Sequence, residues 1–174
     1  ISTQGTGTTF NNYGTVNMGD ISIGDESSTN ATINNFGSFI KVNSGTGTLY
    51  NLIQFNNSLA LVVAEGTLEL RGNGDLGGVL AIEPGSFVIN PNGINFTGSN
   101  VQNNGGISSV LTMAGTSLQS ITGNGLLFAL IINNNSNVSI EGDQAINGDK
   151  LQFINGRAIV AEGKTLTMGP GTDI

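Results

Sequence analysis

The chain lacks cysteine, tryptophan and histidine, and only 10% of its 174 residues are charged. Without cysteine it has no disulfides, and without cysteine or histidine it has no thiolate or imidazole metal site. A catalytic histidine base and a cysteine nucleophile are excluded for the same reason. Because soluble domains carry about 25% charged residues, we expect this surface to consist of Thr, Ser, Asn and backbone turns.

Basic residues are especially few: the chain has five, against twelve acidic residues, which gives a formal net charge of −7. Nucleic acids and anionic membrane surfaces are bound by clustered cations, so we expect neither as a partner. The longest apolar run, residues 126–132, is far shorter than the about 18 residues of a membrane-spanning helix. No signal peptide precedes Ile1, and we interpret the chain as part of a longer protein.

Glycine and short apolar runs are abundant: Gly accounts for 27 residues and hydrophobic residues for 37% of the chain. Segments such as 21–23, 94–96, 137–140 and 151–153 alternate apolar and polar residues with the period of two that is typical of half-buried strands. The even spread of apolar residues argues against a disordered linker. No segment has helical spacing with caps, so we expect an all-β chain.

A seven-residue phrase occurs twice, as FNNYGTV at residues 10–16 and as INNFGSF at residues 33–39. The interval between the two copies recurs between similar Asn motifs, if the interval from Asn56 to Asn103 is interpreted as two periods. The longer interval from Asn103 to Asn133 then requires an insertion. The motifs contain Asn11, Asn12, Asn34, Asn35, Asn56, Asn57, Asn103, Asn104, Asn133, Asn134 and Asn155.

This period favours one of two all-β architectures. A sandwich or barrel built from hairpins requires no such period. In a parallel β-helix, each coil holds about three strands, and equivalent residues stack about 4.8 Å apart. The sequence therefore predicts a single right-handed parallel β-helix (β-solenoid) over residues 1–174, with about seven to eight coils.

Stacking also gives the repeated Asn residues a structural role. A side-chain amide can donate to one stacked neighbour and accept from the other, and Asn tolerates the left-handed backbone of a tight corner. We predict that these residues form a ladder inside a turn. The predicted inward residues are Val16, Met18, Ile33, Phe39, Leu49, Leu61, Leu68, Leu70, Phe87, Ile89, Phe96, Leu111, Leu118, Phe128, Ile140, Phe153, Leu166 and Met168.

The acidic residues are the candidate catalytic groups, because β-helix polysaccharide lyases and hydrolases use clustered carboxylates, often with Ca²⁺ and a basic residue. Glu141 with Glu162, and Glu65 with Glu83, are spaced to lie within one coil. None of the cations Lys41, Arg71, Lys150, Arg157 and Lys164 has an obvious acidic cluster one coil away. We predict no catalytic residues; a fragment of a carbohydrate-active β-helix enzyme is the alternative.

Two further sequence patterns bear on metal binding and ice binding. Gly precedes Asp20, Asp25, Asp75, Asp143 and Asp149, but the calcium-binding nonapeptide of β-rolls and the EF-hand pattern are absent. We expect no cofactor, with structural Ca²⁺ as the alternative. Thr-x-Thr occurs at 6–8, 46–48 and 165–167, without the regular spacing that an ice-binding face requires.

Residues 117–125, 130–134, 138–140, 146–148 and 166–169 carry a family resemblance. They resemble repeats of large exported surface proteins of Bacteroidota and, more loosely, the coils of filamentous haemagglutinin and autotransporter passengers. The resemblance implies a secreted or cell-surface adhesin module, exported by the type IX system, with a role in adhesion or gliding motility. Its partners would be flanking repeats of the same polypeptide, and glycans or surfaces held by avidity.

Overall fold

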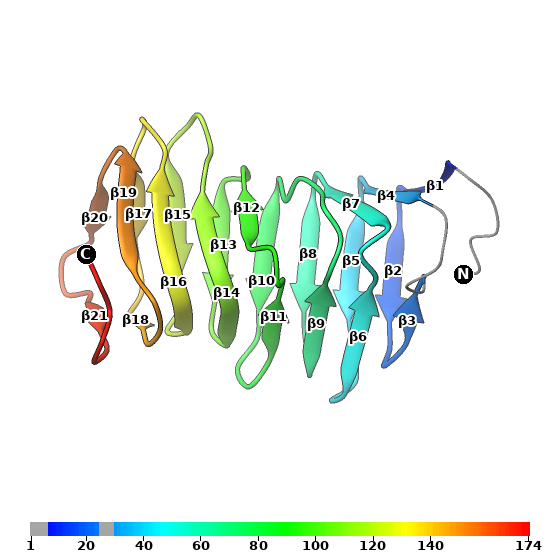
Figure 1. Ribbon diagram of the computed structural model, residues 1–174, viewed down its shortest axis with the longest axis horizontal. Coiled ribbons are helices and arrows are strands. Elements are labelled where there is room, and N and C mark those ends of the chain that lie inside the picture. The colour runs from blue at the N-terminus through cyan, green and yellow to red at the C-terminus, as the bar shows by residue number, and fades with distance from the viewer. Residues whose placement is uncertain (1–6, 25–29) are drawn as a thin grey trace.

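The computed structural model describes residues 7–24 and 30–174, and within these ranges the regular secondary structure consists of 21 strands and no helix. Every pairing between these strands is parallel. The chain winds forward as a β-solenoid of about seven turns (Figure 1). The parallel β-helix prediction is confirmed. A hairpin-based sandwich or barrel is excluded.

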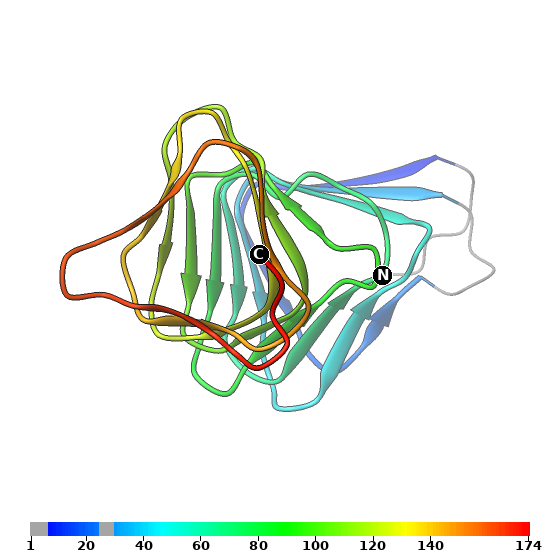
Figure 2. The same ribbon diagram turned by 60° about the vertical axis from the view of Figure 1, so that its left-hand side comes forward.

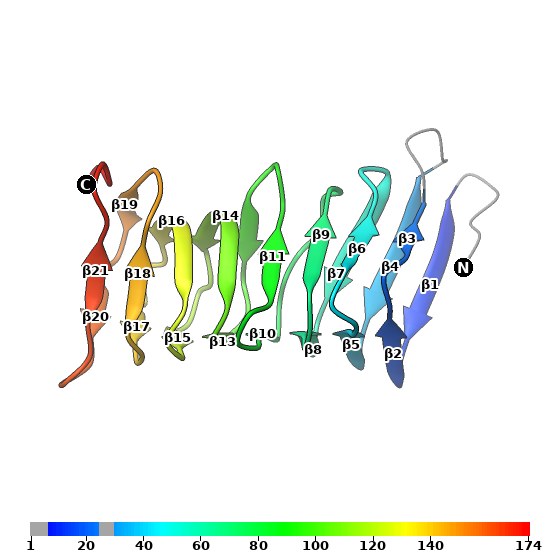
Figure 3. The same cartoon turned by 90° about the horizontal axis from the view of Figure 1, so that it is seen from below.

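The strands form three faces, and successive turns lie side by side from β1–β3 at one end to β19–β21 at the other (Figure 3). The first face consists of β1 (Thr8–Asn12), β4 (Ala31–Asn35), β7 (Ile53–Asn57), β12 (Ile94–Phe96), β19 (Leu151–Asn155) and the C-terminal halves of β14 (Gly106–Met113) and β16 (Leu126–Asn133). The second face consists of β2 (Thr15–Met18), β5 (Ser38–Lys41), β8 (Ala60–Val63), β10 (Val79–Ile82), β13 (Asn100–Asn103), β15 (Gln119–Thr122), β17 (Val138–Ile140) and β20 (Ala158–Val160). The third face consists of β3 (Ser22–Ile23), β6 (Thr46–Leu49), β9 (Thr67–Leu70), β11 (Phe87–Ile89), β18 (Gln144–Ile146), β21 (Leu166–Met168) and the N-terminal halves of β14 and β16.

The length of a turn changes along the solenoid. On the second face, Thr15 pairs with Ser38, and Ser38 pairs with Ala60, at intervals that match the predicted period. From Ala60 onward every interval is shorter, because the next register partners in this row are Val79, Asn100, Ser120, Ser139 and Ile159. On this face the predicted period therefore holds only for the first three turns, which extend further to one side than the later turns (Figure 2). On the first face it recurs once more, where Asn133 pairs with Asn155.

The core is a continuous column of apolar side chains inside the three faces. Ten predicted inward residues are buried: Met18, Ile33, Phe39, Leu49, Leu61, Leu68, Leu70, Phe96, Leu111 and Ile140. Val16 and Leu166 pack partly buried against this core. Phe153 and Met168 pair with buried Ile132 and Ile146, but remain half-exposed because they lie in the last turn described.

Four predicted inward residues were wrong. Phe87 and Phe128 are exposed because Val88 and Leu127 occupy the inward positions of their strands. Ile89 lies on the outward side with Phe87, where it pairs with Glu69. The alternation is therefore shifted by one residue, which exchanges the two sides of a strand. Leu118 is exposed because it belongs to the loop between β14 and β15 and to no strand.

No helix long and apolar enough to cross a membrane occurs in the described ranges.

Candidate functional site

The Asn residues that end β1, β4 and β7 form a buried ladder, here called the inner ladder. Asn12 Nδ2 donates to Asn35 Oδ1 at 2.6 Å, and Asn35 Nδ2 donates to Asn57 Oδ1, also at 2.6 Å. The three residues are at most 5% exposed. Their backbones pair in register, so each amide lies beside its counterpart in the next turn.

The preceding residues form an outer ladder with the opposite direction of donation. Asn34 Nδ2 donates back to Asn11 Oδ1, and Asn56 Nδ2 donates back to Asn34 Oδ1, both at 2.9 Å. These side chains are exposed or half-buried. The two Asn residues of each pair thus lie in different environments, one buried and one accessible to water. The sequence pattern alone does not show which of the two is buried.

The inner amides also hold the corner between the first and second faces. Asn12 Oδ1 accepts from the Gly14 N–H at 3.0 Å, and Asn35 Nδ2 donates to the carbonyls of Gly37 and Ala60 at 3.0 and 2.9 Å. A left-handed backbone plays no part. Among the described non-glycine residues, only Asn43 and Asn137 have positive φ, so that part of the ladder prediction was wrong.

The inner ladder ends after three turns. Asn57 Nδ2 donates to the Gly77 carbonyl at 2.7 Å, and Leu76 takes the next position in the row. Farther along, Asn155 Nδ2 donates to Asn133 Oδ1 at 2.8 Å, which forms one more amide pair on the first face.

The prediction that Asn103 and Asn104 continue this ladder was wrong. Asn103 pairs in register with Ile82 at the corner between the second and third faces, because the shortened turns change which corner an Asn pair reaches. Its Nδ2 donates to Gln144 Oε1 at 2.9 Å. The Asn104 backbone N–H bonds to the Ile82 carbonyl, one residue beyond this corner position.

Two buried glutamines, which the sequence reasoning missed, replace asparagine in the later turns. Gln119 Oε1 accepts from Asn134 Nδ2 at 2.9 Å, and Gln119 Nε2 donates to the Gly98 carbonyl at 2.7 Å. Gln144 Nε2 donates to the Gly123 carbonyl at 2.7 Å. Both glutamines stand two residues before a buried Ile in a short strand, and this period-two position was the available signal.

Lys41 is fully buried at the end of β5. Its Nζ donates to Asp20 Oδ1 at 2.9 Å and to the carbonyls of Val42 and Asn43, each at 2.7 Å. The Asp20 side chain is 41% exposed. Lys41 therefore has an acidic partner one coil away, but this partner is a single carboxylate in an ion pair and not an acidic cluster.

A hollow opens where the first face is interrupted. Between β9 and β10 the chain crosses this face as the irregular segment 71–78, in which Leu76 forms only isolated bridges. Gly72 and Gly74 allow the segment to lie against β7, because a Cβ at either position would collide with the carbonyl oxygen of Ile53 or Phe55. The hollow next to this segment has a volume of about 400 Å³.

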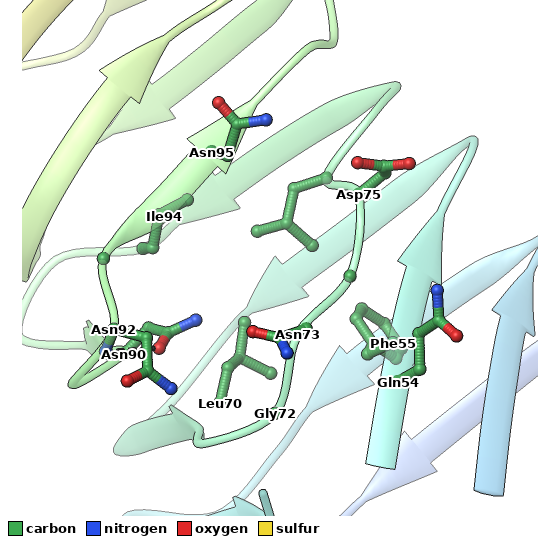
Figure 4. Close-up of a pocket in the computed structure, with 13 residues that line it drawn as sticks. Gln54, Phe55, Leu70, Gly72, Asn73, Asp75, Asn90, Asn92, Ile94 and Asn95 are labelled. Carbon is green, nitrogen blue, oxygen red and sulfur yellow. Dashed lines mark hydrogen bonds between the residues drawn. The ribbon is translucent and has the colours of Figure 1, made fainter. Parts of the chain in front are cut away.

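Apolar and polar side chains line this hollow at different depths (Figure 4). Its apolar lining, Phe55, Leu70, Leu76 and Ile94, is at most 5% exposed and forms the floor. Its rim consists of the exposed side chains of Gln54, Asn73, Asp75, Asn92 and Asn95 and the half-buried Asn90.

Most of the rim groups are free to bind a ligand. Asn92 Nδ2 donates to the Arg71 carbonyl at 3.1 Å, and Asn90 Oδ1 accepts from the Asn92 N–H at 2.9 Å. Within the described ranges, no hydrogen bond or ion pair engages the side chains at four other rim positions, which are Gln54, Asn73, Asp75 and Asn95.

A second hollow of about 330 Å³ adjoins the first and shares Gln54 and Asn73 with it. It extends over β4 and β7, where Ala31, Thr32 and Leu52 line it. The two hollows thus follow the first face across neighbouring turns.

The predicted acidic pairs lie on neighbouring turns. Glu141 and Glu162 are offset by one residue, since Ile140 pairs with Val160, and Glu65 and Glu83 are likewise offset. Asp143 Oδ1 accepts from the Thr165 N–H and hydroxyl at 2.9 and 3.1 Å. Asp25 lies outside the described residues. In the described ranges, no group of three or more acids is placed to hold a metal ion.

The stacked faces and amide rows define the class of protein: a parallel β-solenoid repeat protein. Comparisons with protein-family models, with curated proteins and with solved structures give no match to the chain.

Proposed function

We propose that the chain is a non-enzymatic module of a secreted or cell-surface bacterial adhesin, and that it serves as a stiff stalk or display scaffold without a cofactor. The observation that carries this proposal is the in-register stacking of buried amides. Asn12, Asn35 and Asn57 bind one another across turns. In the later turns, Asn134 donates to Gln119 and Asn103 donates to Gln144. Interior polar groups of this kind fix the stacking of each turn on the next.

Flanking repeats of the same polypeptide are the first proposed partners. In the last described turn, Phe153, Val160 and Met168 are 47%, 41% and 37% exposed, although their register partners are buried. A further coil in the same register would cover these side chains and pair with the outer edges of β20 and β21.

Adhesion is proposed on the nature of the surface. Strands with outward Thr, Ser and Asn side chains and little charge favour many weak polar contacts, and repetition along a longer rod multiplies them through avidity. The resemblance to Bacteroidota surface repeats supports the same role, with export by the type IX system as the proposed route.

Retention and cleavage assays test this function together. Beads coated densely with the purified chain are passed over surfaces carrying immobilised glycans and over bare mineral or polymer surfaces, while the soluble chain is incubated with neutral and acidic polysaccharides. We expect the beads to be retained on at least one surface and no new reducing ends to form. Release of reducing ends or of unsaturated uronates would instead favour a fragment of a carbohydrate-active enzyme.

A further inference from the structure

We propose that the two joined hollows of the first face bind a neutral oligosaccharide, which lies along the solenoid across several turns. This inference rests on the proposed adhesive function and assigns it a site. The site comprises the hollow beside segment 71–78 and the adjoining hollow over β4 and β7.

The rim chemistry matches sugar hydroxyl groups. A hydroxyl both donates and accepts, and a side-chain amide offers two donors and an acceptor. Gln54, Asn73 and Asn95 present free amides, and Asp75 adds a carboxylate that can accept. Because no internal hydrogen bond engages these four side chains within the described ranges, a ligand can bind them without breaking contacts that stabilise the fold.

The floor supplies the apolar part of the site. Ligand pockets combine apolar walls with a few placed polar groups and span about 300–1,000 Å³. The first hollow has this composition, with Phe55, Leu70 and Ile94 below the polar rim, and its volume of about 400 Å³ lies within that range. The C–H face of a pyranose ring fits such a floor, while its hydroxyl groups reach the rim.

The charge of the site favours neutral over acidic sugars. Among the described residues, Asp75 is the one ionisable group that lines either hollow. The guanidinium of Arg71, in the adjoining segment, is held by Glu69 through bonds of 2.9 and 3.0 Å and lies over the Tyr50 ring. A uronate in the site would thus meet a negative charge, in a chain whose formal net charge is −7.

The site extends beyond one sugar ring. Gln54 and Asn73 belong to both hollows, and the second adds about 330 Å³ over the neighbouring strands. The combined site therefore suits a chain of several sugars, oriented along the stacked turns.

Isothermal titration with hexasaccharides of glucose, mannose and xylose, and with hexagalacturonate as the acidic probe, tests the assignment. We expect at least one neutral hexasaccharide to bind with a Kd of about 1 mM or tighter, and hexagalacturonate to bind more weakly. Asn95→Ala and Gln54→Ala should each weaken binding about 3- to 10-fold. Asn17→Ala, which changes an exposed strand amide on the second face, is the matched control and should leave the Kd unchanged.

A third variant addresses charge: Asp75→Asn should reduce the preference for the neutral probe over hexagalacturonate. Failure of all neutral probes to bind, equal binding of the acidic probe, or unchanged affinity in the Asn95→Ala and Gln54→Ala variants would overturn the site. If coated beads are still retained on surfaces in that case, the proposed adhesive function remains supported and only the assignment of the binding site to the hollows is wrong. Cleavage of a bound probe would instead overturn the non-enzymatic function.

Discussion

Asn35 donates its side-chain amide forward to Asn57, whereas the adjacent Asn34 accepts from Asn56 in the reverse direction. Neighbouring residues on one strand therefore belong to two amide rows of opposite polarity. The inner row is buried and also bonds to turn carbonyls, while the outer row is open to water. This difference predicts very different effects of the same substitution at the two positions.

Asn35→Leu should destabilise the protein by about 3 kcal/mol, because a buried polar group left without a partner costs about 1–3 kcal/mol and this change removes four hydrogen bonds at once. Asn57 Oδ1, the Gly37 carbonyl and Asn12 Nδ2 each lose a hydrogen bond. Urea denaturation followed by far-UV circular dichroism measures the loss in free energy of unfolding.

Asn34→Leu is the matched control in the same strand. Its partners are accessible to water, so the loss should be about 0.5 kcal/mol. Equal losses for Asn34→Leu and Asn35→Leu would show that the inner row does not stabilise the stacking.

Gly37 and Gly14 occupy the same corner in consecutive turns, but only one of them tolerates a side chain. A Cβ at Gly37 would collide with the Gly14 carbonyl oxygen, whereas a Cβ at Gly14 would meet nothing within 4 Å. Gly37→Ala should therefore lower the free energy of unfolding by about 2 kcal/mol or more, and Gly14→Ala should change it by less than about 0.5 kcal/mol. Thermal melts of both variants make the comparison, and a tolerated Gly37→Ala would mean that these corners do not stack closely.

The buried ammonium of Lys41 supports a third prediction. Lys41→Met keeps most of the side-chain length but leaves the carbonyls of Val42 and Asn43 and the carboxylate of Asp20 without their donor. We expect a loss of about 2 kcal/mol, below the roughly 3–5 kcal/mol of a fully buried pair, because Asp20 is 41% exposed.

Asp20→Asn provides the comparison for Lys41→Met. It leaves the two carbonyl bonds of Lys41 in place, so chemical denaturation should show a loss below about 1 kcal/mol. If Asp20→Asn were the more damaging change, the ion pair and not carbonyl binding would be the main role of Lys41.

The amide ladder was predictable from the sequence only where one local phrase and one constant period coincide. In the first three turns, the pairs that begin at Asn11, Asn34 and Asn56 recur at the predicted period and meet in register. Asn103 was predicted at the wrong corner because the later turns are shorter on the second face. The residues next to an Asn pair do not show which corner of the solenoid the pair occupies. A turn is shorter where fewer residues connect one face to the next. β14, for example, continues from the third face to the first without an intervening loop.

The inward side of a strand and the position of the hollow depend on tertiary structure. Phe87 and Val88 are both suitable core residues, and the packing of neighbouring turns places Val88 inside. The Gly and Asn residues of segment 71–78 predict an irregular connection, but not a hollow. The hollow exists because β7 and β12 lie on either side of that segment. This arrangement follows from the stacking of the turns and not from the local sequence.

The central claim is that the chain advances by one turn at a time, with like positions stacked along an axis. Pulsed electron paramagnetic resonance on spin-labelled cysteine pairs tests it directly, in a chain that has no cysteine of its own. Thr15 is labelled together with Asn100, Ser139 or Ile159, which lie four, six and seven pairings away in the same row. At about 4.8 Å per pairing, the backbone separations should be about 19, 29 and 34 Å. Label distances that rise in this order and by these steps are the predicted result, whereas distances that stay constant or decrease along the series would contradict the stacked solenoid.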